Sequence, residues 1–277
     1  MATTFSLSSP LLLHNGVQVP QIGLGTWQSR NGEEVVSAVT HALKVGYRHI
    51  DTASIYGNET GIGKAIREAG IPREQLFVTT KVWNSKQGYE STLKAFDQSL
   101  NELGLDYIDL YLIHWPVKGK FKHTWQALEE LYEEGKVKAI GVSNFHVHHL
   151  EELFRSAHIL PMVNQIELHP LLTQKEIIGF CHQHKIQVEA WSPLMQGHLD
   201  LPLLGALSTK YDRSPAQIVL RWNLQIGVIT IPKSVTLRRI EENARIFDFE
   251  LEETDVLALD GLNINRRFGP DPDNFYF

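Results

Sequence analysis

The sequence predicts an α/β protein in which residues 1–277 form a single domain with the (β/α)8 (TIM) barrel fold. A two-part unit recurs along the chain: a short run of β-branched and apolar residues precedes a longer segment with helical periodicity. Strict alternation of strands and helices favours a parallel sheet, and eight such units in about 250 residues are typical of this barrel. The expected strands cover residues 22–26, 47–52, 76–83, 107–115, 137–145, 162–168, 186–194 and 227–234.

An open, doubly wound sheet is the alternative that the same alternation allows. That fold marks its dinucleotide site with a glycine-rich turn after the first strand. The only candidate, GLGTWQ at 23–28, has Gln28 in place of the third glycine. The barrel is therefore the preferred prediction.

Helix boundaries support the same division of the chain. The segments 33–46 and 90–104 have helical periodicity and end in glycine, which suits the position just after a helix. A further helix is expected at 215–225, because Ser214 and Pro215 form a good N-cap and first-turn pair.

The two ends of the chain do not fit the repeating unit. Asn15-Gly16 lies between two apolar runs in LLLHNGVQVP (11–20), which predicts a β-hairpin with a type I′ turn. We expect this hairpin to close the bottom, N-terminal end of the barrel. Segment 261–277 has prolines and aromatic residues without periodicity, and we expect it to form a loop near the mouth.

Composition narrows the classes of partner. Lys and Arg number 26 and Asp and Glu number 32, so the formal net charge is −6, which disfavours a nucleic-acid or anionic membrane surface. The longest apolar run near the N-terminus, Leu11–Leu13, is too short for a signal peptide or a membrane span. Cys181 is the only cysteine, which excludes an intrachain disulfide and suits a reducing compartment. We expect a cytoplasmic monomer without nucleic-acid or membrane partners.

Polar or aromatic residues close the predicted strands at the end where such barrels build active sites. Each has a structural explanation when taken alone, such as a buried ion pair, a core histidine or rim packing. Together they converge on one mouth, which favours a functional role. These residues are Asp51, Lys81, His114, Ser143, Asn144, Gln165, Glu167, Trp191, Ser192 and Lys233.

Tyr56, in the loop after Asp51, suggests the chemistry of this set. A tyrosine has an unperturbed pKa of about 10. We expect the ammonium of Lys81 to lower the pKa of Tyr56 towards neutrality, while Asp51 keeps the lysine charged and oriented. Tyr56 can then give a proton to an oxygen on which negative charge develops, and His114 can orient that oxygen. The reaction that fits is carbonyl reduction, with hydride from a cofactor.

The stretch IPKSVTLRRIEEN (231–243) indicates an anion site. Lys233 and Ser234 stand at the end of the eighth strand, and Arg238 or Arg239 lies in the first turns of the next helix. Cations and helix N–H groups gathered in this way attract phosphate. The structural alternative is a set of exposed basic residues at a helix start.

Five motifs are spread along the chain: GYRHIDTASIYGNE (46–59), LGLDYIDLYLIHWP (103–116), IGVSNF (140–145), NQIELHP (164–170) and IPKSVTLRRIEEN (231–243). With these motifs the sequence resembles the aldo-keto reductase superfamily, and closely its bacterial members related to 2,5-diketogluconate reductase and methylglyoxal (glyoxal) reductase. The resemblance implies a catalytic tetrad of Asp51, Tyr56, Lys81 and His114, with Tyr56 as general acid.

The resemblance also implies NADPH or NADP+ as cofactor. An aromatic ring at position 191 would stack on the nicotinamide, and this chain has Trp191 where many members have tyrosine. Contacts from Lys233 and Arg239 to the 2′-phosphate imply a preference for NADPH over NADH. The implied cofactor residues are Thr26, Trp27, Ser143, Asn144, Gln165, Trp191, Ser192, Leu194, Lys233, Ser234, Val235, Arg239, Glu242 and Asn243.

The substrate pocket is predicted to be apolar, because indoles follow the first, third and fourth strands, although rim packing is an alternative for each. The pocket residues are Trp27, Trp83, His114 and Trp115. Phe268 and residues 275–277 are expected to close part of the mouth. The substrate is a small-molecule carbonyl compound.

No metal site is predicted. His146 and His149 lie one helical turn apart, but no third ligand with metal-site spacing accompanies them. Cys181 is interpreted as a small buried apolar residue.

The function predicted is NADPH-dependent reduction of aldehydes and activated ketones, including 2-oxoaldehydes such as methylglyoxal. A narrower keto-sugar-acid reductase of the 2,5-diketogluconate type and a non-catalytic NADPH-binding barrel are the alternatives. A metal-dependent hydrolase on the same barrel is disfavoured because it lacks a ligand cluster.

Overall fold

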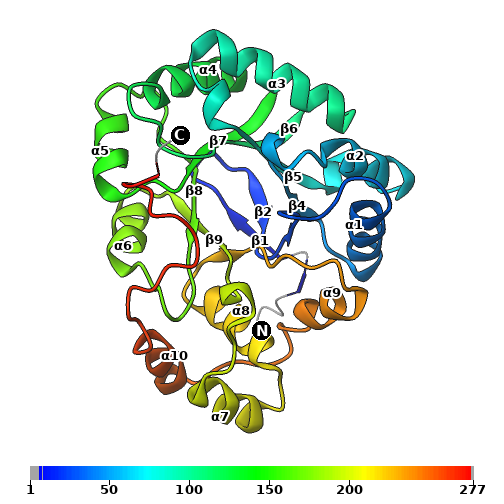
Figure 1. Cartoon of the computed structure of the whole chain (residues 1–277), viewed down its shortest axis with the longest axis vertical. Helices are drawn as coiled ribbons and strands as arrows, with labels where there is room; N and C mark the ends of the chain where they lie inside the picture. The colour runs from blue at the N-terminus through cyan, green and yellow to red at the C-terminus, as the bar shows by residue number, and fades with distance from the viewer. Residues whose placement is uncertain (1–5, 8, 276–277) are drawn as a thin grey trace.

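A ring of helices surrounds a central ring of parallel strands in the computed structural model of the chain (Figure 1), which describes residues 6–7 and 9–275. The main sheet has eight strands in the order β10-β9-β8-β7-β6-β5-β4-β3. Parallel bridges between Ile22 and Thr230 and between Gly25 and Lys233 join its two edges. The sheet therefore closes into the predicted (β/α)8 barrel.

Each barrel strand lies within its predicted segment but is shorter, because the flanking residues continue into loops. The strands are β3 (Leu24–Gly25), β4 (His49–Asp51), β5 (Phe77–Val82), β6 (Ile108–Ile113), β7 (Val137–Ser143), β8 (Val163–Glu167), β9 (Gln187–Trp191) and β10 (Ile229–Thr230).

The helices predicted from periodicity and caps are confirmed as α1, α3 and α8. Gly46 and Gly104 follow α1 and α3 in the left-handed conformation, with φ of 117° and 63°. The Ser214 hydroxyl accepts a hydrogen bond from the backbone of Gln217 at the start of α8. The helices are α1 (Glu33–Val45), α2 (Glu59–Glu68), α3 (Tyr89–Leu103), α4 (Phe121–Glu133), α5 (Val147–Phe154), α6 (Lys175–Gln183), α7 (Pro202–Tyr211), α8 (Pro215–Gln225), α9 (Leu237–Ala244) and α10 (Glu253–Asp260), with short 3-10 helices η1 (Ser54–Tyr56), η2 (Arg73–Gln75), η3 (Asn84–Lys86) and η4 (Met195–Gly197). No helix in residues 6–7 and 9–275 is long and apolar enough to span a membrane.

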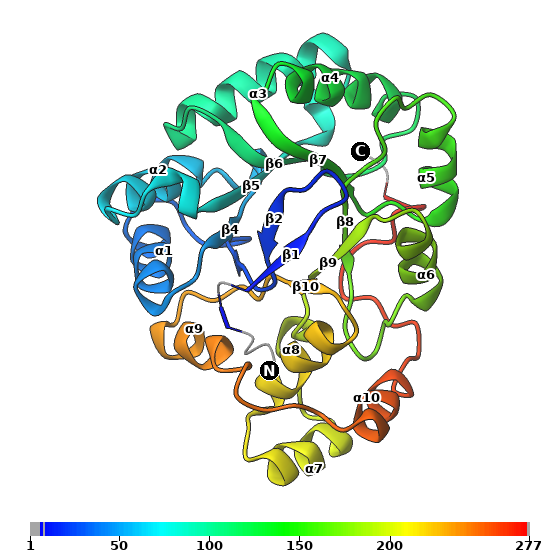
Figure 2. The same cartoon turned by 180° about the vertical axis from the view of Figure 1, so that it is seen from behind.

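An antiparallel hairpin of β1 (Pro10–Leu12) and β2 (Gln18–Pro20) lies across the far end of the barrel (Figure 2). The Asn15 amide donates a hydrogen bond to the Lys138 carbonyl at the start of β7, which fixes the hairpin at the N-terminal end of the strands. The hairpin was predicted, but its type I′ turn is wrong.

A type I′ turn requires positive φ at both central residues, and here only Gly16, with φ of 88°, is left-handed. The Gly16 N–H donates a hydrogen bond to the Leu13 carbonyl, and the Leu13 N–H donates one to the Val17 carbonyl. Residues 14–16 therefore form the loop between these bonded residues. The Asn15 side chain accepts a hydrogen bond from the Val17 N–H. This local bond supports the turn although Asn15 is not left-handed.

Candidate active site

A buried ion pair lies at the mouth end of the barrel, between the neighbouring strands β4 and β5. The Lys81 ammonium donates hydrogen bonds to Asp51 Oδ1 at 2.7 Å and to the Thr52 carbonyl at 2.8 Å. Burial lowers the pKa of Lys81, but Asp51 and other neighbours outweigh it, and the net shift is upward. Burial raises the pKa of Asp51, against the opposing effects of Lys81 and Gln165. Because the two charged groups are in direct contact, we assign the pair as ionised.

A second carboxyl, Glu189 on β9, lies behind this pair. The Gln165 amide on β8 donates to Asp51 Oδ2 at 2.8 Å and to Glu189 Oε1 at 3.1 Å, so one side chain joins the two acids. Burial and the charge of Asp51 raise the pKa of Glu189 to about 8. Glu189 is therefore predominantly protonated at neutral pH, and the buried cluster holds one carboxylate against one ammonium.

Tyr56 is placed beside this pair by the loop that follows β4. The loop forms η1, and Gly57 ends it with a left-handed φ of 64°. Asn58 is fully buried and donates to the carbonyls of Thr26 and Ser29, which ties the loop to the end of β3. The Lys81 ammonium lies 5.4 Å from the centre of the Tyr56 ring.

The expected lowering of the Tyr56 pKa is wrong in direction. Burial raises the pKa of Tyr56 and outweighs the lowering by the ammonium and hydrogen bond of Lys81. Tyr56 is thus a fully protonated phenol at neutral pH. A protonated phenol is the state that a proton donor would need.

His114 follows β6 and faces Tyr56 across the mouth. Its ring centre lies 5.8 Å from that of Tyr56 and 5.2 Å from that of Trp83, both edge to face. Burial and Lys81 hold the pKa of His114 well below its ordinary value, so the imidazole is neutral. Its Nδ1 is buried without a hydrogen-bond partner among the described residues, and the residue lines the cavity described below.

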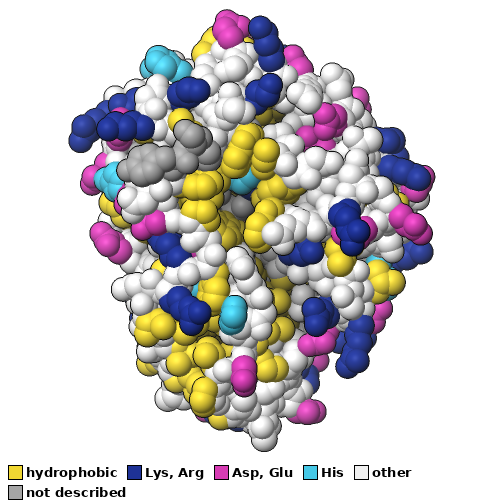
Figure 3. All heavy atoms as spheres, viewed as in Figure 1, with side chains coloured by type: hydrophobic (Ala, Val, Ile, Leu, Met, Phe, Trp, Pro, Cys, Tyr) yellow, Lys and Arg dark blue, Asp and Glu magenta, His cyan; other side chains and the backbone are white. Residues whose placement is uncertain are grey.

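Tyr56 and His114 open into a cavity of about 500 Å³. Hydrophobic side chains rim the hollow on this face of the molecule (Figure 3). The indoles of Trp27, Trp83 and Trp115 all line it, as does that of Trp191. The cavity is therefore lined largely by aromatic side chains and lies next to a protonated phenol and a neutral imidazole.

Comparison with known proteins identifies the family of the chain. The profile of the Aldo/keto reductase family matches residues 21–264. The chain belongs to the aldo/keto reductase family. It is 58% identical over 273 residues to the glyoxal reductase of Bacillus subtilis (strain 168), covering 98% of this chain and 99% of that protein. It is 47% identical over 268 residues to the methylglyoxal reductase DkgA of Escherichia coli (strain K12), covering 95% and 96%. The crystal structure of a Gox0644 mutant in complex with NADPH has a TM-score of 0.92 and 43% identity, covering 97% of this chain and 98% of that one.

The chain is thus an oxidoreductase, and its aldo/keto reductase fold brings most of the predicted residues to one cavity. Lys81 is buried behind the cavity rather than in its wall. The cavity is lined by Thr26, Trp27, Asp51, Tyr56, Trp83, His114, Trp115, Ser143, Asn144, Gln165, Trp191, Ser192 and Lys233. Among the predicted cofactor residues, Leu194, Ser234, Val235, Arg239, Glu242 and Asn243 do not line it.

Most of these outlying residues lie on the loop after β10 and on α9. Lys233 and Arg239 are exposed there, and neither forms an ion pair with any residue of the described chain. Ser234 is buried, and its hydroxyl accepts a hydrogen bond from the Thr236 backbone at the start of α9. Two unpaired cations at a helix N-terminus form a surface suited to an anion.

The C-terminal segment forms part of the cavity wall. Phe268 and Phe275 line the cavity, as expected, whereas residues 276–277 lie outside the described residues. Glu167, fully buried at the end of β8, accepts hydrogen bonds from the backbone N–H groups of Phe268 and Gly269. A Cβ atom on Gly269 would overlap the Trp191 ring, so only glycine allows this approach.

Several wall residues were not predicted. They include Gln28, Ile55, Gln196, Ile231, Gly269 and Pro270. Gln28, Ile55 and Ile231 lie in segments that the sequence analysis singled out, but no signal in the sequence shows which side chains of a connecting segment reach the mouth. Glu167 was noted only as a strand-end acid, and its role as an anchor for the C-terminal segment was missed.

Proposed function

We propose that this aldo/keto reductase reduces aldehydes and activated ketones with NADPH, and that 2-oxoaldehydes such as methylglyoxal are among its substrates. The observation that carries the proposal is the placement of Tyr56 and His114 on one apolar cavity, with the Asp51–Lys81 ion pair behind the tyrosine. The names of the glyoxal and methylglyoxal reductases among its relatives support the same substrate class.

The residues present fit the proposed cofactor. Lys233 and Arg239 are free cations near the α9 N-terminus, where the 2′-phosphate would bind. Trp191 offers a partly exposed indole, held by a hydrogen bond of 2.8 Å from its Nε1–H to Asn144 Oδ1. Gln165 uses its amide hydrogens on Asp51 and Glu189, which leaves its carbonyl oxygen able to accept from the nicotinamide carboxamide.

Proton delivery follows from the same geometry. When bound, NADPH supplies the hydride that adds to the carbonyl carbon. Tyr56 donates its proton to the carbonyl oxygen as negative charge develops there, and Lys81 stabilises the resulting phenolate. His114 is neutral and can donate a hydrogen bond from Nε2 to the same oxygen, which fixes the direction of the carbonyl.

The charge of the cavity favours aldehydes over keto-sugar acids. Among the described lining residues Lys233 is the only cation, and it belongs to the proposed cofactor site. The carboxylate of a sugar acid would find indole and phenyl rings instead of a charged partner. We therefore place small aldehydes ahead of 2,5-diketogluconate-type substrates.

The test is NADPH consumption by the purified protein with methylglyoxal, an aromatic aldehyde and a diketo sugar acid. Tyr56→Phe should lose nearly all turnover yet bind NADPH as before. Tyr132→Phe is the matched control, because the Tyr132 hydroxyl contacts Asn15 of the hairpin and not the cavity. Tight NADPH binding without turnover of any carbonyl compound would refute the reductase and favour a non-catalytic NADPH-binding barrel.

A further inference from the structure

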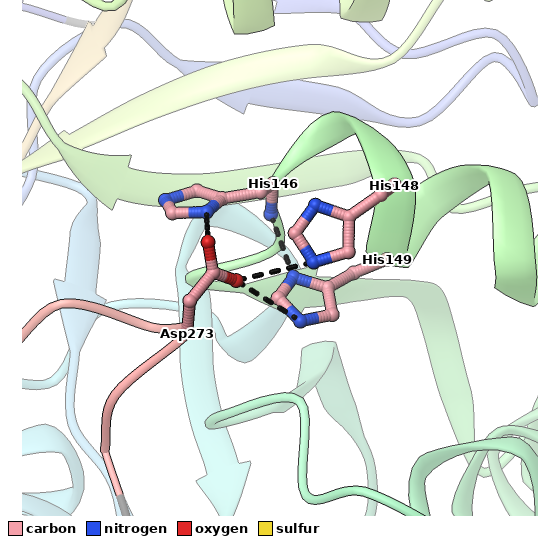
Figure 4. A group of neighbouring side chains, drawn as sticks. All are labelled: His146, His148, His149 and Asp273. Carbon is pink, nitrogen blue, oxygen red and sulfur yellow. Dashed lines mark hydrogen bonds and ion pairs between the residues drawn. The ribbon is translucent and has the colours of Figure 1, made fainter.

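Figure 4 shows a cluster of three histidines and one aspartate, none of which lines the cavity. His146 stands just before α5, His148 and His149 lie in its first turn, and Asp273 comes from the C-terminal segment. One ligand atom from each of the four side chains lies within 4.8 Å of all the others. The sequence showed only the histidines, because Asp273 is far away along the chain.

The donor set suits a borderline transition-metal ion. Zn²⁺ takes imidazole nitrogen and carboxylate oxygen in tetrahedral sites, at about 2.0–2.1 Å, so its ligand atoms lie about 3.3–3.4 Å apart. The Asp273 oxygens lie 3.0 Å from His146 Nδ1, 3.1 Å from His148 Nε2 and 3.5 Å from His149 Nε2. Mg²⁺ and Ca²⁺ prefer oxygen ligands and do not match three imidazoles.

We propose that His146, His148, His149 and Asp273 bind one Zn²⁺-class ion that ties the C-terminal segment to α5. Asp273 is the critical ligand, because it is the one carboxylate among the four side chains and its negative charge is favourable near the N-terminus of α5. Phe275, two residues further on, contacts Trp115 with ring centres 4.4 Å apart. The ion would therefore fix the segment that forms one wall of the substrate cavity.

Two hydrogen bonds around the cluster compete with metal binding, and this competition can be tested by mutation. Arg267 donates to His146 Nε2 at 2.9 Å, which places the proton of that ring on Nδ1, toward Asp273. His149 Nδ1 accepts from the His146 backbone N–H at 3.1 Å, which places its proton on Nε2. In each of these two rings, the proton must move to the other ring nitrogen before the ring can bind the metal ion. Arg267 can release His146 by turning to Glu167, which lies 4.0 Å away.

The experiment is calorimetric titration of the full chain, without an affinity tag, with Zn²⁺ and in parallel with Mg²⁺. We expect one Zn²⁺ per chain and no binding of Mg²⁺. Asp273→Asn should weaken Zn²⁺ binding at least about tenfold, and so should the double variant His148→Gln, His149→Gln. His123→Gln, an exposed histidine on α4, is the matched control and should bind Zn²⁺ like the wild type.

Two further readouts test the details. Arg267→Met should tighten Zn²⁺ binding, because His146 Nε2 can then carry the proton and Nδ1 can bind the ion. An unchanged Zn²⁺ affinity would show that His146 is not a ligand. Zn²⁺ should slow amide hydrogen exchange at residues 271–275 in the wild type but not in Asp273→Asn. Absence of Zn²⁺ binding, or binding that Asp273→Asn leaves unchanged, would overturn the proposal.

Discussion

Replacing Lys81 by methionine tests whether the buried ion pair serves catalysis or only stability. The side chain keeps a similar length but loses its charge, so Asp51 keeps its hydrogen bond from Gln165 and loses the one from Lys81 at 2.7 Å. Removing one partner of a buried pair costs about 3–5 kcal/mol. At about 2–4 °C per kcal/mol for a chain of this size, the melting temperature should fall by roughly 6–20 °C, while the barrel stays folded at 25 °C.

A double-mutant cycle separates the ion pair from general damage. Asp51→Asn in the Lys81→Met background removes the carboxylate that has lost its partner. The double variant should therefore be about 1–3 kcal/mol more stable than expected from the summed losses of Lys81→Met and Asp51→Asn. Calorimetry or urea unfolding of the four proteins gives this coupling free energy. Strictly additive losses would refute the assignment of Asp51 and Lys81 as a coupled pair.

Turnover of the same Lys81 variant tests its catalytic role. In the proposed mechanism Lys81 stabilises the Tyr56 phenolate, so loss of the ammonium should lower kcat about 10²–10⁴-fold. NADPH-dependent reduction of methylglyoxal is the assay. A folded Lys81→Met protein with turnover close to the wild type would show that the pair is purely structural.

Three further predictions concern the cofactor site, the second buried acid and the cysteine. The double variant Lys233→Ala, Arg239→Ala should remove two charge-assisted contacts to the 2′-phosphate, worth about 3–6 kcal/mol in total. The affinity for NADPH should fall by about two to four decades, with little effect on NADH binding. Equal weakening of NADPH and NADH binding would contradict the 2′-phosphate assignment. The pKa of Glu189 is about 8 in the folded protein against an ordinary 4.5, so between these pH values the folded state holds a proton that the unfolded state releases. The free energy of unfolding should therefore fall as pH rises from 4.5 to 8, by at most about 1.4 kcal/mol per pH unit. Urea unfolding at several pH values should show a flatter profile for Glu189→Gln, and identical slopes would argue against a protonated Glu189. Burial raises the pKa of Cys181 to about 11, so a thiol reagent should leave it unmodified in the native protein at pH 8 and react after denaturation; rapid native labelling would show that the site opens.

The barrel and its polar mouth were predictable because their signals are local. Each strand has its own apolar run, and the fold places the ends of all strands at one mouth, so Asp51 and Lys81 could be paired without tertiary information. The direction of the Tyr56 pKa shift was not predictable in this way. Sequence identifies the neighbouring ammonium, but the opposing desolvation depends on how deeply the finished structure buries the phenol.

The contacts of the C-terminal segment show the same limit over longer distances. Glu167 and Phe268 are 101 residues apart, and His146 and Asp273 are 127 apart. Segment 261–277 has no periodicity from which a partner could be inferred. The sequence could place this segment near the mouth in general terms but could not identify its two anchors.

Those two anchors explain how a segment without secondary structure can form a defined wall. Glu167 holds the backbone of Phe268 and Gly269, and the histidine cluster holds Asp273 at the other end. The chain between and just beyond them carries Pro270 and Phe275 into the cavity. Fixing both ends of a short loop leaves few backbone conformations, so a few polar contacts offset the entropic cost of ordering it. The proposed catalytic groups come from strand ends and from the loops just after them, whereas this tethered segment forms one side of the cavity wall.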